Sequence, residues 1–293
     1  MMEKIEIVAE IGINANGDIN LAKKLIDAAV LSGCTLVKFQ KRTIDAVYTK
    51  AELDKPRESP WGTTNRQQKE GLEFNTIQYH IIDTYCKEKG IKWFASPWDV
   101  GSVGFLNKYD IPFIKVASAL MTNTPVLEAI KKTGKDVIIS TGMSSEYELN
   151  NVVEFFGPQL KYILSCTSTY PTKVEDLNMN RIITLQRLYS QNQCIEKDSF
   201  MAQYKRQEPI KIGYSNHAAG ILPVVQAVIM GCEMVEYHIT LDRSLYGSDQ
   251  SASIELPGML KIKNYIEDIQ KSWGDGEIKC LDSEKPIRDK LRK

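Results

Sequence analysis

Histidine is scarce in this chain of 293 residues: only His80, His217 and His238 occur. No apolar run approaches the roughly 18 residues that a membrane span needs. The amino-terminal MMEKIEIVAEIG enters a strand pattern without the features of a signal peptide. The net charge is zero, and no basic stripe with interleaved aromatics is present, which argues against a nucleic-acid partner. Any anionic ligand must therefore be held by a local cluster of charges.

No CxxC pair occurs among the cysteines, which are scattered along the chain. This spacing is typical of reduced, mostly buried thiols, so we expect a cytoplasmic protein. For Cys166 and Cys232, which lie in or next to strand-like segments, we expect a packing role rather than reactivity. The cysteines are Cys34, Cys86, Cys166, Cys194, Cys232 and Cys280.

Short apolar runs alternate with amphipathic stretches, most of which end in a glycine suited to a helix carboxyl terminus. Eight such units in strict alternation predict an α/β fold, a single (β/α)8 TIM barrel. The alternative is a doubly wound sheet, but EIGINANGD after the first strand does not fit its GxGxxG turn. The strand-like runs are 5–11, 35–40, 91–96, 112–118, 136–141, 161–167, 209–215 and 233–239.

The predicted barrel occupies residues 1–272, and 273–293 form a charged tail or linker without a strand. Two connections are too long for plain loops. Residues 41–73 follow the second strand, so we expect a substrate-covering loop at the face where barrel enzymes carry their chemistry. Residues 190–208 precede the seventh strand, so we expect an insertion at the opposite face.

Polar or charged residues end nearly every predicted strand. A purely structural end face would not need them, because buried charges are costly unless they are paired or liganded. These strand-end residues are Glu10, Lys38, Gln40, Ser96, Lys115, Ser118, Ser140, Thr141, Thr167, Ser168, Tyr170, Ser215, Asn216, His217, Glu236 and His238.

Lys38 and Lys115 each stand within an apolar strand, in VKFQ and IKVAS. A strand lysine normally faces solvent, but both faces of a parallel barrel are covered, so an inward lysine needs an anionic partner. Two lysines, with the hydroxyls of serines 96, 118, 140 and 168, suit a phosphate and a carboxylate on one small substrate. The rival interpretation is a Schiff-base lysine, which needs one desolvated lysine with a depressed pKa.

His217 and His238 lie 21 residues apart, each at the end of a strand-like run. Two imidazoles on neighbouring strand ends have the geometry of a divalent metal site with open positions, although ordinary buried histidines remain the alternative. Glu10, Glu236 and Asp249 are the acidic candidates. Asp249 follows the last strand and either reaches the site or is a solvated loop carboxylate.

Taken together, the strand-end segments resemble the sialic acid synthase (N-acetylneuraminate synthase) family. The resemblance implies a transferase that condenses phosphoenolpyruvate with an open-chain N-acetylhexosamine. The acceptor would be N-acetylmannosamine or a related 2-acetamido sugar, and the products a nonulosonic acid and phosphate. It also implies Mn²⁺ or Mg²⁺ at His217 and His238. The motifs, within residues 5–258, are AEIGINANGD, VKFQ, ASPWD, IKVAS, STGMS, SCTSTYPT, DLN, GYSNH and EYHITLD.

The resemblance also implies roles for the strand-end residues, with Glu10, Lys38, Lys115 and Glu236 as the catalytic set. Glu10 would lie near the reacting carbons. Phosphoenolpyruvate would be surrounded by Lys38, Lys115, Ser96, Ser118, Ser140, Ser168 and Ser215. The amino sugar would contact Gln40, Tyr170, Glu236 and Asp249.

Four positions depart from the family pattern: Ala15, Ser165, Ser168 and Asn216. Asn216 replaces the usual Asp before His217, so we expect weaker metal affinity or an altered substrate choice. In the family, a segment like the last residues here leads into a small antifreeze-like domain. The resemblance therefore covers the barrel domain, and the expected partner is either a second copy in a homodimer or a separate antifreeze-like cap protein.

Two other functions fit the same residues. A metal-dependent aldolase or lyase would use pyruvate, and its two strand lysines would then have no phosphate to hold. A non-catalytic sugar-phosphate-binding barrel is compatible with Asn216.

Overall fold

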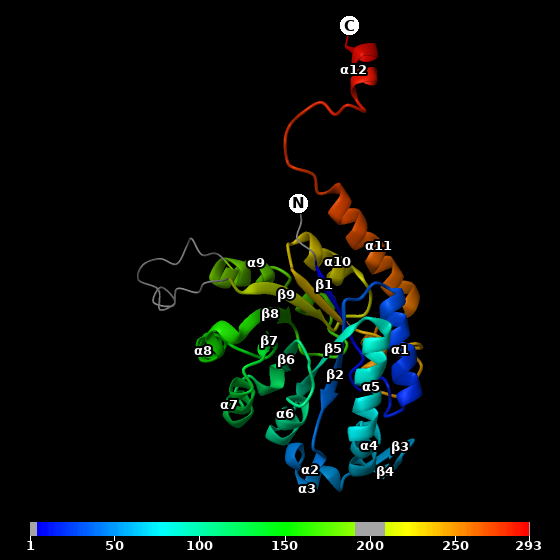
Figure 1. The fold of residues 1–293 in the computed structure, drawn as a ribbon, viewed down its shortest axis with the longest axis vertical. Coiled ribbons are helices and arrows are strands. Elements are labelled where there is room, and N and C mark those ends of the chain that lie inside the picture. Colours follow the sequence, from blue (N-terminus) through cyan, green and yellow to red (C-terminus); the bar gives the residue numbers. More distant parts are fainter. Residues whose placement is uncertain (1–4, 191–208, 293) are drawn as a thin grey trace.

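Eight parallel strands close into a barrel in the computed structural model, which describes residues 5–190 and 209–292 (Figure 1). The order around the barrel is β1-β2-β5-β6-β7-β8-β9-β10 and back to β1. The predicted (β/α)8 barrel is thus confirmed, and each strand overlaps a predicted run. The strands are β1 (Glu6–Glu10), β2 (Leu36–Lys41), β5 (Lys92–Pro97), β6 (Phe113–Val116), β7 (Asp136–Ser140), β8 (Leu160–Cys166), β9 (Lys211–Asn216) and β10 (Met234–His238).

One helix follows each barrel strand and covers its outer side (Figure 1). The local signals explain the helix ends: Asn75 caps the start of α5 in a capping box, and Gly90 ends it in the left-handed region at φ 68°. The covering helices are α1 (Ile19–Leu31), α5 (Thr76–Lys89), α6 (Val100–Leu106), α7 (Thr124–Lys132), α8 (Glu146–Phe156), α9 (Arg181–Leu185), α10 (Leu222–Ile229) and α11 (Leu256–Ser272).

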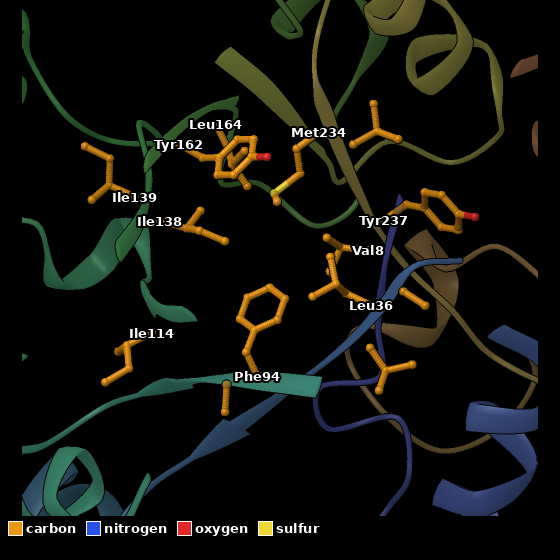
Figure 2. Packing of buried hydrophobic residues seen from close by; sticks show 14 of the residues in the cluster. Val8, Leu36, Phe94, Ile114, Ile138, Ile139, Tyr162, Leu164, Met234 and Tyr237 are labelled. Carbon is orange, nitrogen blue, oxygen red and sulfur yellow. The ribbon is translucent and has the colours of Figure 1, made fainter. Parts of the chain in front are cut away.

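The inside of the barrel has two layers with different chemistry. Figure 2 shows the apolar layer, where Val8, Leu36 and Phe94 lie among the buried side chains. Strand side chains alternate in direction, so the residue two positions further on each strand also points inward. Those next residues are Glu10, Lys38 and Ser96, all at most 5% exposed. The apolar floor therefore carries a polar layer at the carboxyl ends of the strands.

The long connection after β2 has its own structure. It contains α2 (Ile44–Val47), α3 (Lys50–Leu53), the antiparallel hairpin of β3 (Pro56–Ser59) with β4 (Gly62–Thr64), and α4 (Asn65–Leu72). It leaves the carboxyl end of β2, the side that carries the polar layer. Its role as a substrate cover stays a prediction. The predicted insertion at 190–208 lies, beyond Ser190, outside the described residues.

The carboxyl-terminal segment extends away from the barrel (Figure 1). Helix α11 ends at Ser272, where we placed the end of the barrel domain, and residues 273–292 are exposed. The segment contains the short helix α12 (Lys285–Leu291), which has no buried residue. Across the described residues, no helix is both long and apolar enough to cross a membrane.

Candidate active site

The polar layer lines a pocket of about 630 Å³, including its open mouth. All of the predicted site residues except Asp249 line it, together with four that we did not single out as site residues and Cys166. The lining residues that we predicted are Glu10, Lys38, Gln40, Ser96, Lys115, Ser118, Ser140, Ser168, Tyr170, Ser215, His217, Glu236 and His238. Their gathering in one place is established by the fold, and their roles stay predictions.

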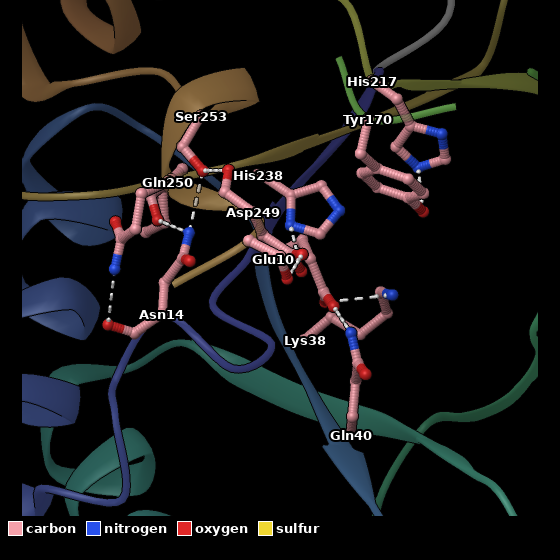
Figure 3. A network of polar contacts seen from close by, with 12 residues as sticks. Glu10, Asn14, Lys38, Gln40, Tyr170, His217, His238, Asp249, Gln250 and Ser253 are labelled. Carbon is pink, nitrogen blue, oxygen red and sulfur yellow. Dashed lines mark hydrogen bonds and ion pairs between the residues drawn. The ribbon is translucent and has the colours of Figure 1, made fainter. Parts of the chain in front are cut away.

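Two lysines and two glutamates form a charge-balanced cluster at the base of the pocket. Figure 3 shows its Lys38 and Glu10. Lys38 Nζ lies 2.9 Å from Glu10 Oε2 and 3.2 Å from Glu236 Oε1. Lys115 Nζ lies 2.6 Å from Glu236 Oε1. Both lysines point inward, as expected, because the barrel covers both faces of each strand.

The pKa values of the cluster's members are shifted in different directions. Burial alone would lower the pKa of Lys38, but Glu10 and Glu236 outweigh it and raise that pKa. Burial lowers the pKa of Lys115, and Glu236 only partly offsets this. Burial opposes the charge of Glu236 too, but the two lysines dominate and hold its pKa well below the usual range. The raised pKa of Lys38 and the lowered pKa of Glu236 both favour the charged forms of this pair at neutral pH.

Two hydroxyl groups around this cluster lack a partner in the described part of the chain. Ser96 Oγ and Ser140 Oγ are buried and make no hydrogen bond there. Ser118 Oγ, by contrast, donates to the Ser140 carbonyl oxygen at 3.3 Å and lies 3.3 Å from Cys166 Sγ. Buried polar atoms are normally hydrogen-bonded, so orphaned hydroxyls in a pocket indicate a place for ligand oxygens.

His217 and His238 face each other across the pocket, with ring centroids 5.5 Å apart. His217 Nδ1 lies 2.6 Å from the Thr167 carbonyl oxygen, and its Nε2 lies 3.0 Å from Tyr170 Oη. Because a carbonyl oxygen only accepts, Nδ1 donates to Thr167, which leaves Nε2 as the ring's lone-pair nitrogen. Burial, aided by His238, lowers the pKa of His217 to about 3, so the imidazole is neutral.

Asp249 approaches this pair from the loop after β10. Its Oδ2 lies 3.6 Å from His238 Nδ1, although Asp249 is not among the lining residues. The loop is fixed by Asn14, whose Nδ2 donates to Ser253 Oγ at 2.8 Å, while Ser253 Oγ donates to the Asp249 carbonyl oxygen at 2.7 Å (Figure 3). His238 Nδ1 makes no hydrogen bond among the described residues, so Asp249 is an acidic neighbour of the ring and not a hydrogen-bonded partner.

The side chains at the expected metal site can be compared with the ligands that Mn²⁺ and Mg²⁺ prefer. Two imidazoles suit Mn²⁺ or Mg²⁺ only as a partial set, because these ions take six ligands and prefer oxygen. No group of three or more His, Cys, Asp or Glu side chains that could hold a metal is found in residues 5–190 and 209–292. His217 and His238 therefore fit a metal whose other positions are taken by substrate oxygens and water, and this site stays a prediction.

Asn216 does not touch either imidazole in the described structure. Its Nδ2 donates to the Ala218 carbonyl oxygen at 2.9 Å, and its Oδ1 accepts from Tyr214 Oη at 3.2 Å. The side chain thus uses both ends of an amide to fix the turn after β9. A carboxylate at this position would lack the donor for Ala218. Among the other departures from the family pattern, Ala15 and Ser165 are buried, and Ser168 lines the pocket.

Sequence reasoning missed part of the lining. Cys166, which we expected only to pack, is buried and also faces the pocket. The alternation of side chains along a strand could have identified two of the missed residues. Trp98 lies two positions after the inward Ser96, and Cys166 lies two positions after the inward Leu164. The four lining residues that we had not predicted to belong to the site are Trp98, Ala117, Ala119 and Met143.

A closed parallel barrel with a charged pocket at the carboxyl ends of its strands defines a (β/α)8-barrel enzyme. The comparisons place it more closely: the chain belongs to the NeuB family, whose model matches residues 25–194 and 199–278. The predicted resemblance is thus confirmed.

Two curated relatives and one solved structure show the extent of the likeness. The N-acetylneuraminate-9-phosphate synthase of Mus musculus is 35% identical over 98% of this chain and 76% of its own length. The N,N'-diacetyllegionaminic acid synthase of Legionella pneumophila is 33% identical over 98% and 78%. The sialic acid synthetase of Leptospira borgpetersenii superposes with a TM-score of 0.78 at 28% identity, covering 99% and 93% of the two chains. The expectation of an enzyme of the transferase class is confirmed.

Proposed function

We propose that this protein condenses phosphoenolpyruvate with an open-chain N-acetylhexosamine, giving a nonulosonic acid and phosphate. The observation that carries the proposal is the pairing of two buried lysines with orphaned hydroxyls in one pocket. Phosphoenolpyruvate has two anionic groups on three carbons, and two cations with several hydroxyls complement them. Two of the relatives are named as an N-acetylneuraminate-9-phosphate synthase and an N,N'-diacetyllegionaminic acid synthase, and these names support the same reaction.

The lysines keep donors for this substrate although they are already paired. An ammonium group has three N–H donors. Lys115 directs one at Glu236, and Lys38 has two carboxylate neighbours, Glu10 and Glu236. The remaining N–H groups, with Ser96 and Ser140, would bind phosphate and carboxylate and stabilise the charge that develops as phosphate departs.

Divalent metal, held by His217 and His238, would polarise the sugar aldehyde as a Lewis acid. The remaining steps use the chain's own groups. Carbon 3 of the enolpyruvate attacks the aldehyde carbon, and water adds to the cation left at carbon 2. Glu10 Oε1, held by Gln40 Nε2 at 2.7 Å, would orient that water. The tetrahedral intermediate then loses phosphate by cleavage of its carbon–oxygen bond.

The pyruvate aldolase alternative makes a different prediction for Lys115. Its lowered pKa meets one requirement of a Schiff-base lysine. However, Glu236 Oε1 holds Lys115 Nζ at 2.6 Å as an ion pair, which favours the ammonium form and anion binding. Borohydride with pyruvate should therefore leave the protein unmodified, and a trapped adduct at Lys115 would favour the aldolase.

The test measures phosphate release with phosphoenolpyruvate, Mn²⁺ and a panel of 2-acetamido hexoses. We expect release only when all three are present, and release without a sugar would contradict the proposal. His217→Ala should lower kcat by about 100-fold or more, since removing a transition-state contact of about 2.7 kcal/mol has that effect. His80→Ala is the matched control, because His80 is exposed on α5. Whether a homodimer or an antifreeze-like cap completes the sugar end stays a prediction.

A further inference from the structure

Met143 has a backbone conformation that its side chain disfavours. Its φ is 61°, in the left-handed region where the β-carbon of an L-residue crowds the following carbonyl oxygen. In residues 5–190 and 209–292, the other non-glycine residues with positive φ are Asn16 and Asn178. Asparagine tolerates this region because its short polar side chain forms local hydrogen bonds, which methionine cannot do. The conformation of Met143 is therefore imposed by its surroundings.

A tight turn after β7 holds Met143 in this conformation. The Thr141 N–H donates to the Leu164 carbonyl oxygen of β8 at 3.0 Å, and the Ser144 N–H donates to the Thr141 carbonyl oxygen at 3.2 Å. The capping box of Ser145 then starts α8. A turn closed in this way, with positive φ at its third residue, favours glycine or asparagine at that residue. Backbone strain that is fixed from both sides is typical of functional sites.

The glycine of this turn stands at the neighbouring position. The φ of Gly142 is not positive, so the turn itself does not require a glycine there. The pocket requires it instead, since a β-carbon at Gly142 would lie 2.0 Å from Ser168 Oγ. At position 143, where the turn favours glycine, the chain has a long apolar side chain. The order of the two residues follows from the needs of the pocket and not from those of the turn.

The Met143 side chain lies at the mouth of the pocket. It is among the lining residues, yet Met143 is 70% exposed, so it lies where the pocket opens. The serine hydroxyls expected to hold phosphoenolpyruvate surround the adjacent Gly142. Methionine is unbranched and flexible, which lets it adapt to the shape of a ligand. Covering a ligand with an exposed apolar side chain is favourable in proportion to the apolar area removed from water.

We propose that Met143 is a substrate-binding residue whose thioether side chain folds over bound phosphoenolpyruvate and packs on its carbon atoms. The inference rests on the proposed condensation and adds one residue to its site. The lysines and serines would hold the two anionic ends of this substrate, which leaves the carbon atoms between them for an apolar contact. Covering these atoms also excludes water, and attraction between the anionic groups and the lysines is stronger where water is excluded.

Oxidation by hydrogen peroxide tests the contact without turnover. The thioether takes one oxygen atom from the peroxide and becomes a sulfoxide, with water as the other product. We expect saturating phosphoenolpyruvate, added without metal or sugar, to slow sulfoxide formation at Met143 severalfold, as measured by mass spectrometry of peptides. Met230, which packs on the core and is not among the lining residues, is the internal reference. Its oxidation rate should be the same with and without the ligand.

Substitutions separate a binding role from a structural one. Met143→Gly and Met143→Ala should each lower kcat/KM for phosphoenolpyruvate about tenfold, which corresponds to a lost contact of about 1.4 kcal/mol, and mostly through KM. Met143→Leu, of similar volume, should retain most of the value. Only glycine relieves the strain, so Met143→Gly should unfold at a higher urea concentration than Met143→Ala, the reverse of the usual order. Asn178→Ala is the matched control, because Asn178 has a φ of 47° but is exposed and not among the lining residues.

Each outcome supports or overturns the inference. Unchanged kcat/KM in both Met143→Gly and Met143→Ala overturns it. Equal oxidation of Met143 with and without phosphoenolpyruvate also overturns it when calorimetry shows that this ligand binds, and phosphate release would then still support the condensation. Protection of Met143 without any phosphate release keeps the contact and contradicts only the condensation. If phosphoenolpyruvate neither binds nor yields phosphate, the condensation fails, and the substrate assigned to Met143 fails with it.

Discussion

Glycine at position 142 keeps the hydroxyl cluster of the pocket open. A β-carbon there would lie 2.0 Å from Ser168 Oγ, 2.8 Å from Ser118 Oγ and 2.9 Å from Cys166 Sγ. Real side chains do not approach so closely, so even a methyl group would displace these three groups or occupy the space between them. The absence of a side chain is therefore part of the shape that would receive the anionic groups of a small substrate.

We expect Gly142→Ala to lower kcat/KM for phosphoenolpyruvate by about 100-fold, a loss of about 2.7 kcal/mol of transition-state stabilisation. Overpacking should lower the free energy of unfolding by about 1–3 kcal/mol. Steady-state kinetics and urea unfolding measure the two effects. Gly104→Ala in α6 is the control, because nothing lies within 4 Å of its added β-carbon. Unchanged kinetics in Gly142→Ala would show that the cluster does not hold the substrate.

At the same scale, the sequence predicted those site residues whose chemistry conflicts with their surroundings. Lys38 and Lys115 were recognised because a charged side chain in an apolar strand needs a partner. Trp98 and Cys166 were missed although their spacing from Ser96 and Leu164 indicated an inward direction, because an aromatic ring and a thiol are also common in a core. The closed barrel then showed that both line the pocket.

Among the elements, helix α6 is capped by the carboxylate of Asp99, which also accepts a hydrogen bond from the connection after β2. Asp99 Oδ1 accepts from the Ser102 backbone N at 2.8 Å, and its Oδ2 accepts from Ser102 Oγ at 2.6 Å and from the Thr43 backbone N at 2.7 Å. Burial would raise the pKa of Asp99, but these hydrogen bonds from Ser102 and Thr43 outweigh it and lower that pKa.

A lowered pKa in the folded state means that the ionised carboxylate contributes its full stabilisation above the unfolded pKa of about 3.9. This contribution is lost progressively as the pH falls toward and through the lower folded pKa. We expect Asp99→Ala to lower the free energy of unfolding by about 0.5–2 kcal/mol near pH 7, because a helix cap is lost. In urea titrations the difference from the native chain should be constant above about pH 5 and shrink below about pH 4. Asp99→Asn should retain part of the cap. A difference at pH 3 as large as the one at pH 7 would contradict this account.

The strands of the barrel were predictable because parallel strands buried on both faces give near-continuous apolar runs. The hairpin of β3 and β4 was not, because PRES and GTT are short, polar and largely exposed. Its position depends instead on Trp61, which packs between Gly71 of α4 and Tyr246. Contacts between segments so far apart in the sequence leave no local pattern, so the rim of the site emerged only from the structure.

For the molecule as a whole, a net charge of zero hides an uneven distribution. At the base of the pocket, Lys38 and Lys115 are balanced by Glu10 and Glu236. Zero net charge indicated that an anionic ligand must be held by a local cluster of charges, and the buried cluster in the pocket is such a group.

Residues 273–292 contribute little to the stability of this molecule, since all of them are exposed. Helix α12 has seven residues, and helices shorter than about 12 residues are marginal in water without packing. We therefore expect deletion from Gly274 onward to change Tm by less than about 2 °C, because roughly 1 kcal/mol would be needed for a shift of about 2–4 °C. Deletion from Ile266 onward is the control, since Ile266 is buried against the barrel and its loss should lower Tm markedly. A large fall in Tm on removing only the exposed segment would mean that it packs on the barrel in solution. An unchanged Tm with lost turnover would instead show that the segment serves the reaction and not the fold.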